Sequence, residues 1–302
     1  MKQTILYFIT FIVVNSALAQ SIENSIDAED AWGAWMVKGT TKAWVVDQIP
    51  ERARLWDYTQ NKVLVTIPLK EDVISFNVMN DGSLAYISHN ELNEYIVLTQ
   101  EGEESSKKFK SNAPAYYIHP DGQFFFGSTF DGFITYTLKE NKISNSKLNE
   151  SITNYSRSFV ETLSPQSFFR NGKDVIQKID ISDDGKLSVA RAFDKDLLLM
   201  SEQKNEFVMM TSAGYKKYSL PDLELKTSKN WPNEIDFVDA VYNSEKQVIY
   251  YSGSSQINTL DLATGEVVKG IDVDGDLQFK DRIGDTVIAY SASQSKFYIV
   301  KL

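Results

Sequence analysis

The segment DVDGD, residues 272–276, holds the densest group of side chains that could bind a metal, and Asp281 follows it. Hard cations such as calcium take several oxygen ligands from a tight loop. The EF-hand loop places Gly at its sixth position and Glu at its twelfth, whereas here Gly is fourth and the twelfth position is Ile283. These departures favour a solvated turn over a calcium site, and we predict no bound metal.

Other catalytic chemistry has little support in the sequence. The chain has no Cys, which excludes disulfides, thiolate metal sites and a Cys nucleophile. His89 and His119 each stand alone in loop or turn positions, and the Gly-x-Ser-x-Gly elbow, the phosphate loop and the dinucleotide fingerprint are all absent. We predict a protein that is not an enzyme and has no cofactor, although folding could pair two of its 41 acidic residues for acid–base work.

Tryptophan is the residue type that most suggests binding. Trp32 and Trp231 each stand beside turn residues, just before a predicted strand. Exposed aromatic side chains are frequent binding anchors, and the alternative for both is that they cap a structural junction. Trp35, Trp44 and Trp56 lie inside predicted strands, and we expect them to pack in the core.

The formal net charge of −10 at pH 7 limits the partners that the protein can have. Proteins that bind nucleic acids use Lys and Arg to displace counterions from phosphates. A surplus of acidic residues therefore argues against a nucleic-acid partner.

Residues 1–19 have the pattern of a secretory signal peptide. Lys2 supplies a positive charge, residues 5–14 are mostly apolar, and Ala17-Leu18-Ala19 is a typical cleavage site. The apolar run is shorter than the roughly 20 residues that a membrane span needs. We expect a soluble mature protein that begins at Gln20, in the periplasm or at the cell surface. Export of a protein without Cys favours a bacterial envelope.

Short runs rich in β-branched and aromatic residues recur through residues 20–302, separated by tight-turn signals. The stretches that begin at Val73 and Ala113 align with each other, and their Asp-Gly pairs lie 40 residues apart. Asp-Gly supplies the positive φ that tight hairpins need. Units of this kind start near residues 34, 73, 115, 156, 196, 235 and 275.

A four-stranded unit of about 40 residues is the blade of a β-propeller. We predict one all-β domain, residues 20–302, with seven blades. The last unit has only three strands, so the stretch Ser21–Ala28 is expected to supply the fourth and to close the ring. Residues 175–193 could begin a unit out of phase, which leaves six or eight blades as alternatives.

RLWDYTQNKVLVTI, residues 54–67, together with the Asp81-Gly82 and Asp121-Gly122 units, resembles WD40 and related YVTN-type propeller repeats. Trp56-Asp57 stands where that family carries its name-giving dipeptide. The resemblance implies a rigid platform that binds other macromolecules, and it does not identify the partner.

In such a ring, the links between blades and the turns between second and third strands emerge on one face. The predicted strands place the following residues on that face: Trp32, Glu71, Asp72, His89, Asn90, Tyr155, Trp231, Asp272 and Asp274. Aromatic and acidic side chains together predict a basic or mixed protein surface as partner, such as part of an outer-membrane or envelope complex. The alternatives are a propeller hydrolase or lyase that acts on sugar or peptide material at the channel mouth, and a lectin-like sugar binder that uses Trp32 and Trp231.

Overall fold

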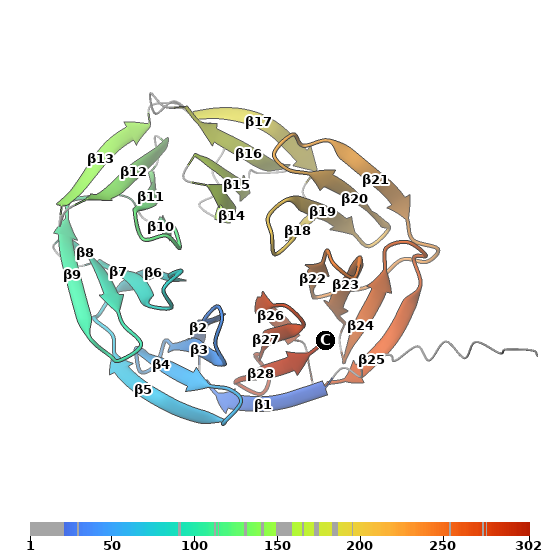
Figure 1. Ribbon diagram of the computed structural model, residues 1–302, viewed down its shortest axis with the longest axis horizontal. Coiled ribbons are helices and arrows are strands. Elements are labelled where there is room, and N and C mark those ends of the chain that lie inside the picture. Colours follow the sequence, from blue (N-terminus) through green and yellow to red (C-terminus); the bar gives the residue numbers. More distant parts are fainter. Residues whose placement is uncertain are drawn as a thin grey trace, which may run out of the picture.

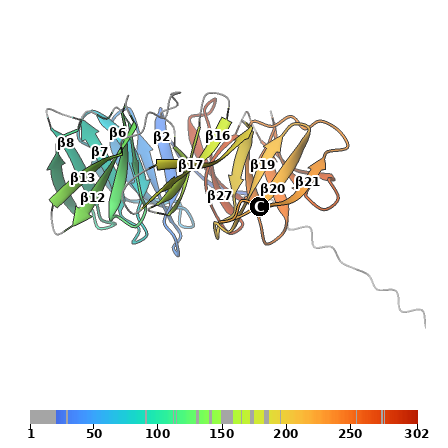
Figure 2. The ribbon, with the colours of Figure 1, turned by 90° about the horizontal axis from the view of Figure 1, so that it is seen from above.

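The computed structural model describes residues 21–302 except Glu29, 90–91, Asn112, Pro114, 130–131, 140–141, 149–158, Pro165, 172–174, 183–186, Lys195, Ser254, Asp274 and Asp276. These residues form seven four-stranded antiparallel sheets arranged as the blades of a ring (Figure 1). Seen edge-on, the ring is a disc (Figure 2). The described residues contain no helix that is long and apolar enough to cross a membrane. The predicted all-β, seven-bladed propeller is confirmed.

The first four blades follow the chain, each from the centre of the ring outward. Blade 1 contains β2 (Ala31–Met36), β3 (Lys42–Asp47), β4 (Arg52–Asp57) and β5 (Lys62–Pro68). Blade 2 contains β6 (Val73–Val78), β7 (Leu84–His89), β8 (Asn93–Leu98) and β9 (Glu104–Phe109). Blade 3 contains β10 (Ala115–Ile118), β11 (Phe124–Thr129), β12 (Gly132–Lys139) and β13 (Lys142–Leu148). Blade 4 contains β14 (Phe159–Ser164), β15 (Ser167–Asn171), β16 (Val175–Ile181) and β17 (Leu187–Asp194).

The remaining blades complete the circle. Blade 5 contains β18 (Leu197–Met200), β19 (Glu206–Thr211), β20 (Gly214–Ser219) and β21 (Leu225–Asn230). Blade 6 contains β22 (Asp239–Asn243), β23 (Val248–Ser252), β24 (Gln256–Asp261) and β25 (Val267–Asp272). Blade 7 contains β26 (Leu277–Ile283), β27 (Thr286–Ser291), β28 (Lys296–Lys301) and, as its outermost strand, β1 (Ser21–Asp27).

Strand β1 closes the ring, as predicted. It pairs antiparallel with β28, from Ser21 opposite Lys301 to Asp27 opposite Lys296. The two strands come from opposite ends of the domain and lie side by side in Figure 1. Their pairing gives blade 7 its fourth strand and covers the edge of β28 that would otherwise be open.

Blade 4 resolves the uncertainty over the number of blades. The stretch 175–193 forms the third and fourth strands of that blade, because β16 pairs with β15 on one side and with β17 on the other. It therefore does not begin a unit out of phase, and the alternatives of six or eight blades are wrong.

The apolar core lies between neighbouring blades. The inner strands β3 and β7 are buried along almost their whole length, whereas the outer strands β5 and β21 are largely exposed. One cluster joins Trp44 and Leu55 of blade 1 to Tyr86 and Ile96 of blade 2, and corresponding clusters join other neighbouring pairs. Trp44 and Trp56 are fully buried and Trp35 is partly buried, which agrees with their expected packing.

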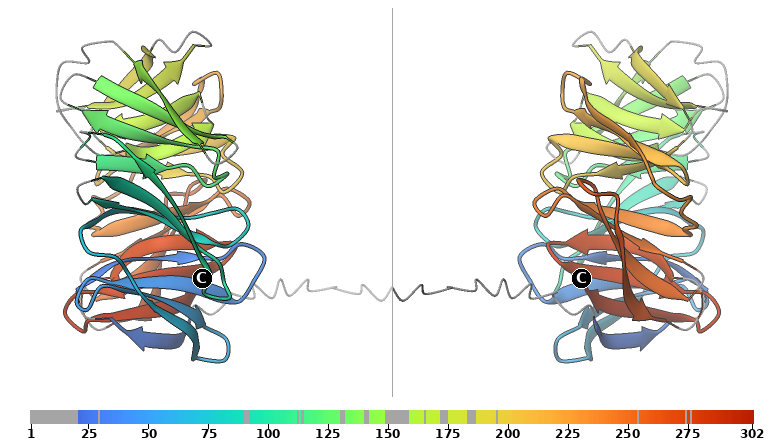
Figure 3. Two further views of the ribbon diagram at one scale, coloured as in Figure 1. Left: turned by 90° about the vertical axis from the view of Figure 1, so that its left-hand side faces the viewer. Right: turned by 90° about the vertical axis from the view of Figure 1, so that its right-hand side faces the viewer.

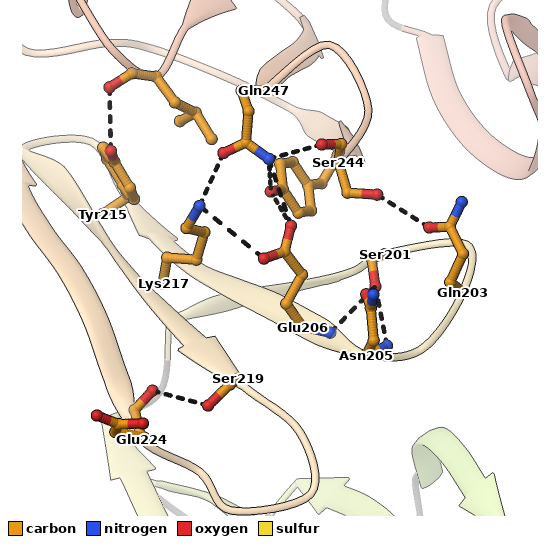
Figure 4. Close-up of polar contacts among 12 residues, drawn as sticks. Ser201, Gln203, Asn205, Glu206, Tyr215, Lys217, Ser219, Glu224, Ser244 and Gln247 are labelled. Atoms are coloured by element: carbon orange, nitrogen blue, oxygen red, sulfur yellow. Dashed lines mark hydrogen bonds and ion pairs between the residues drawn. The ribbon is translucent and has the colours of Figure 1, made fainter.

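Polar contacts also join blades. Between blades 5 and 6, the Tyr242 hydroxyl donates to Glu206 Oε1 at 2.5 Å, and Lys217 Nζ donates to Gln247 Oε1 at 2.7 Å (Figure 4). Gln247 Nε2 in turn donates to the Tyr242 oxygen at 3.0 Å. Such satisfied networks fix the angle between two sheets, and they make the ring a rigid support.

The antiparallel order of each blade defines two faces of the disc. One face carries the links between blades and the turns between second and third strands, and we call it the link face. The other face carries the turns between first and second strands and between third and fourth strands, and we call it the turn face. The side views show the strands crossing the thickness of the disc between these two faces (Figure 3).

Candidate functional site

The predicted site residues within the described part of the chain all lie at the link face. These are Trp32, Glu71, Asp72, His89, Trp231 and Asp272. Asn90, Tyr155 and Asp274 lie outside the described residues. The side chains that reach this face differ in exposure, and only some of them are open to a partner.

Trp32 is exposed, as expected of an anchor. It is the second residue of β2, the innermost strand of blade 1, and not part of the link before that strand. Its ring centroid lies 6.0 Å from that of Phe76 in blade 2. This contact supports the indole on one side and leaves much of it accessible to solvent.

Trp231 is not exposed, and the capping alternative describes its position. Its side chain is 7% exposed, and its ring stacks on that of Tyr215 with centroids 5.0 Å apart. The indole Nε1 donates to the Thr211 carbonyl at 3.2 Å. A buried, stacked ring offers little surface to a partner, so the lectin-like alternative loses one of its two indoles.

Glu71 and Asp72 present exposed side chains beside blade 2. Asp72 has a φ of +58°, a conformation that Asp and Asn adopt more readily than most residues. This geometry lets the Asp72 carbonyl accept the backbone N–H of His89 at 2.8 Å, and the Glu71 carbonyl accepts the Ser88 hydroxyl at 2.7 Å. Both backbones are fixed while the side chains remain exposed.

His89 and Asp272 have polar partners within the ring. His89 Nδ1 lies 2.5 Å from Asn93 Oδ1, and Asn93 Nδ2 donates to the Tyr116 hydroxyl of blade 3. Asp272 Oδ1 accepts a hydrogen bond from Gln256 Nε2 at 3.0 Å. The described residues contain no group of acidic or His side chains that could hold a metal. Asp274 and Asp276 of the calcium alternative lie outside those residues.

Two exposed apolar residues at the same face as Trp32 were missed by the sequence interpretation. Ile49 is 62% exposed in the turn between β3 and β4, and Leu92 is 41% exposed in the turn between β7 and β8. An aliphatic residue in a tight turn between two buried strands is the signal that could have identified them. Asp30 and Glu51 accompany them in neighbouring loops.

Backbone hydrogen bonds join these loops into one surface. The Gln48 N–H donates to the Asp30 carbonyl at 2.9 Å, and the Leu69 N–H donates to the Glu51 carbonyl at 3.0 Å. With the bond from His89 to Asp72, these contacts connect successive loops of blades 1 and 2. We call this surface the link-face patch, and it consists of Trp32, Ile49, Leu92, Asp30, Glu51, Glu71 and Asp72.

A buried ion pair supports the patch from below. Asp47 precedes the turn that carries Ile49, and its carboxylate accepts Arg54 Nη2 at 2.7 Å and Arg52 Nε at 2.6 Å. Asp47 and Arg54 are buried. Arg54 also donates to the Asp27 carbonyl at 2.7 Å, which connects the turn to strand β1. The turn therefore presents Ile49 from a fixed base.

The exposed large apolar side chains elsewhere follow a simple pattern. Val238 lies in a link before β22, also at the link face. The others lie on outermost strands, and they are Ile22, Val63, Leu64, Val189, Leu225, Val267 and Val268. The described turns of the turn face contain none. Apolar exposure, and not charge, distinguishes the two faces, because acidic residues outnumber basic ones in the described loops of both.

The turn-face mouth of the central channel forms a cavity of about 630 Å³. Two carboxylates line it, and both accept backbone N–H groups: Glu202 from Gly284 at 3.1 Å, and Asp281 from Met36 at 2.7 Å. His119 lies in a separate turn, stacked on Phe124 and paired with Asp121 at 2.8 Å.

No family model matches the chain, and no curated protein matches it. Among solved structures, it is similar to the β-propeller domain of Cps50 (Swd1) from Myceliophteria thermophila, with a TM-score of 0.66 and 11% sequence identity over 94% of this chain and 99% of that one. At this identity the similarity concerns the fold alone. The chain has the fold of a seven-bladed, WD40-like β-propeller.

Proposed function

We propose that this protein is an exported, non-enzymatic propeller that binds a protein partner in a bacterial cell envelope through the link-face patch. The observation that carries the proposal is the exposure of Trp32 near the start of β2, and of Ile49 and Leu92 in turns, at one face where backbone hydrogen bonds join successive loops. Exposed apolar and aromatic side chains with polar residues nearby are typical of protein interaction sites. The WD40-like propeller fold is itself a common support for such sites.

The acidic residues of the patch indicate the chemistry of the partner. Glu71, Asp72, Asp30 and Glu51 lie in loops of the same face as the apolar side chains, so a partner surface with apolar residues flanked by Lys or Arg fits it best. Complementary charge mainly accelerates association, whereas the buried apolar contacts supply most of the affinity.

Support for export comes from the sequence of residues 1–19, with its positive charge, apolar run and A-x-A site. Support for a non-enzymatic role comes from the channel mouth, where Glu202 and Asp281 already accept backbone hydrogen bonds. His89 and His119 also have partners within the ring, away from each other in the sequence and on opposite faces.

Co-purification of tagged variants from the native host tests the binding surface. Leu92→Ser changes the patch, and Leu225→Ser changes a leucine of similar exposure, 41% against 48%, on the outer strand β21. We expect Leu92→Ser to lose a partner that the wild type and Leu225→Ser retain, since interface anchors contribute about 1–3 kcal/mol. Equal retention by both variants would contradict the proposal.

Asp72→Asn isolates the electrostatic contribution. Asn tolerates the same positive φ, so the backbone contact with His89 is preserved while the charge is removed. We expect slower association and a weaker dependence of the association rate on salt, with the dissociation rate nearly unchanged. An unchanged association rate would show that the acids of the patch do not face the partner.

Cell fractionation of the native host tests export. The proposal predicts a soluble periplasmic or extracellular protein whose first residue is Gln20. An uncleaved N-terminus in the cytoplasmic fraction would refute it.

A further inference from the structure

The channel cavity on the turn face has an apolar wall and a cationic wall. Trp35 of β2, Phe76 of β6 and Phe279 of β26 line it, and the ring centroids of Trp35 and Phe76 lie 5.9 Å apart. Lys280 and Arg282, which follow Phe279 on β26, also line it, as does Lys204 of the turn between β18 and β19. The innermost strands that carry these residues surround the centre of the ring (Figure 1).

The carboxylates near the cavity already have partners. Asp281 accepts the backbone N–H groups of Met36 and Arg282, both at 2.7 Å, and Glu202 accepts that of Gly284. Asp239 accepts the backbone N–H of Ala240 at 2.8 Å. Asp285 is paired with Lys246 at 2.9 Å. These hydrogen bonds and this ion pair do not involve the side chains of Lys280 and Arg282, although Asp239, Glu202 and Asp285 lie close enough to act on those charges.

Lys280 and Arg282 have hydrogen-bond partners but no ion pair with a described carboxylate. In the described part of the chain, the Lys280 ammonium donates to Gln278 Oε1 at 2.8 Å and lies 5.8 Å from the centroid of the Tyr290 ring. Arg282 donates to the carbonyl oxygens of Gly284 and Tyr242. Neither cation has a described carboxylate within ion-pair distance, so both keep hydrogen-bond donors that no described carboxylate uses.

Partial burial in the cavity lowers the pKa of both Lys280 and Arg282 and so disfavours their charged forms. The pKa of Lys280 falls below the usual range for this reason, although Asp239 acts against this and the side chain keeps contact with solvent. Burial likewise lowers the pKa of Arg282, against the effect of Glu202 and Asp285. A bound anion would compensate both charges where water does so incompletely.

We propose that this cavity binds a carboxylate carried on an aromatic body, either a free aromatic acid or the C-terminal aromatic residue of a peptide. The carboxylate accepts hydrogen bonds from Lys280 and Arg282, and the ring packs against Trp35, Phe76 and Phe279. A volume of about 630 Å³ accommodates a ligand of this size. The cavity opens on the face opposite the link-face patch, although Phe76 of its wall also contacts Trp32 of the patch. The Lys280 variants leave Trp32, Ile49 and Leu92 unchanged, so the two proposals are tested separately.

Isothermal titration at constant ionic strength tests the site with two acids and their neutral amides. Benzoate represents the free acid, and N-acetyl-phenylalanine represents the chain end. We expect saturable binding of at least one acid, about tenfold or more tighter than its amide, because a charge-assisted hydrogen bond is lost with the charge. An acid that binds no better than its amide, or no acid binding at all, would overturn the proposal.

Lys280→Gln is the decisive variant, and Lys62→Gln on the exposed outer strand β5 is its control. We expect Lys280→Gln to abolish the preference for acid over amide while Lys62→Gln retains it. If Lys280→Gln does not fold, Lys280→Met keeps the aliphatic stem and is measured instead. Retention of the full preference by the Lys280 variant would also overturn the proposal.

Discussion

At the scale of single residues, Asp57 of the Trp56-Asp57 dipeptide has a structural role in a turn. Its Oδ1 accepts the backbone N–H groups of Thr59 and Gln60, both at 3.1 Å, and the hydroxyl groups of Thr59 and Thr41. Burial alone would raise the pKa of Asp57, but these hydrogen bonds hold it below its ordinary value. The acidic half of the Trp-Asp pair therefore stabilises a turn.

Replacing Asp57 by Ala should make stability less dependent on pH. A lowered pKa means that the contribution of Asp57 is complete above the unfolded pKa of about 3.9 and is lost as the pH falls through the folded value. We expect Asp57→Ala to cost about 1–3 kcal/mol near pH 7, with a smaller cost near pH 3. Urea unfolding at both pH values measures this, and a cost that does not shrink in acid would contradict the assignment.

The tryptophans show which residue roles could be predicted. Trp32 and Trp231 have similar sequence contexts, and only Trp32 is exposed. Trp231 differs because its backbone N–H donates to the Ala213 carbonyl at 2.9 Å, its indole N–H donates to the Thr211 carbonyl, and its ring stacks on Tyr215. Such a contact between a link and a turn about twenty residues apart has no sequence signature.

At the scale of elements, the Asp-Gly turn attaches one blade to the preceding blade. The Trp44 indole donates to the Gly82 carbonyl at 2.9 Å, and Gly82 has a φ of +84°. A Cβ at Gly82 would lie 2.6 Å from Cγ1 of the buried Val37. The repeat at 40 residues was visible in the sequence because Asp81-Gly82 and Asp121-Gly122 occupy the same turn, between the first and second strands, in blades 2 and 3.

Gly82→Ala and Gly39→Ala separate two reasons why a turn needs glycine, a positive φ and the lack of room for a Cβ. Gly39 also has a positive φ, +74°, but a Cβ there would meet nothing within 4 Å. We expect Gly39→Ala to cost about 1–2 kcal/mol for the left-handed backbone, and Gly82→Ala to cost about 1–3 kcal/mol more for the collision with Val37. Thermal unfolding measures both, and equal costs would contradict docking of the turn against blade 1.

The strand positions in blade 4 could not be predicted from the repeat pattern alone. The stretch 175–193 contains two strands around an Asp-Gly pair, as a first hairpin would, yet it forms β16 and β17. Strand pairing with β15 decides its place, and pairing between strands is a tertiary property that a local pattern does not specify.

At the scale of the whole molecule, stability depends on the strand that closes the ring. Ile26 of β1 is buried in the cluster that contains Phe297 of blade 7 and Trp56 of blade 1, whereas Ile22 of the same strand is exposed. Closure could be predicted because the last unit lacked one strand and the stretch from Ser21 was unassigned.

Two alanine substitutions on β1 test closure. We expect Ile26→Ala to cost about 2–4 kcal/mol, as for other buried aliphatic residues, and Ile22→Ala to cost less than about 0.5 kcal/mol. Chemical denaturation measures the difference. Comparable small effects for both would show that β1 contributes little to the closed ring.

Binding through the link face is the claim about the whole molecule on which the proposed function depends. Photo-crosslinking in the native host tests it most directly, with a photoreactive residue placed at Ile49, at Leu92, or at Val268 on the outer strand β25. Ile49 and Val268 have similar exposure, 62% and 59%, so accessibility alone does not separate them. We predict one and the same adduct from Ile49 and Leu92 and none of that mass from Val268. The adduct from Val268 alone, or equally from all three positions, would contradict binding through the link face.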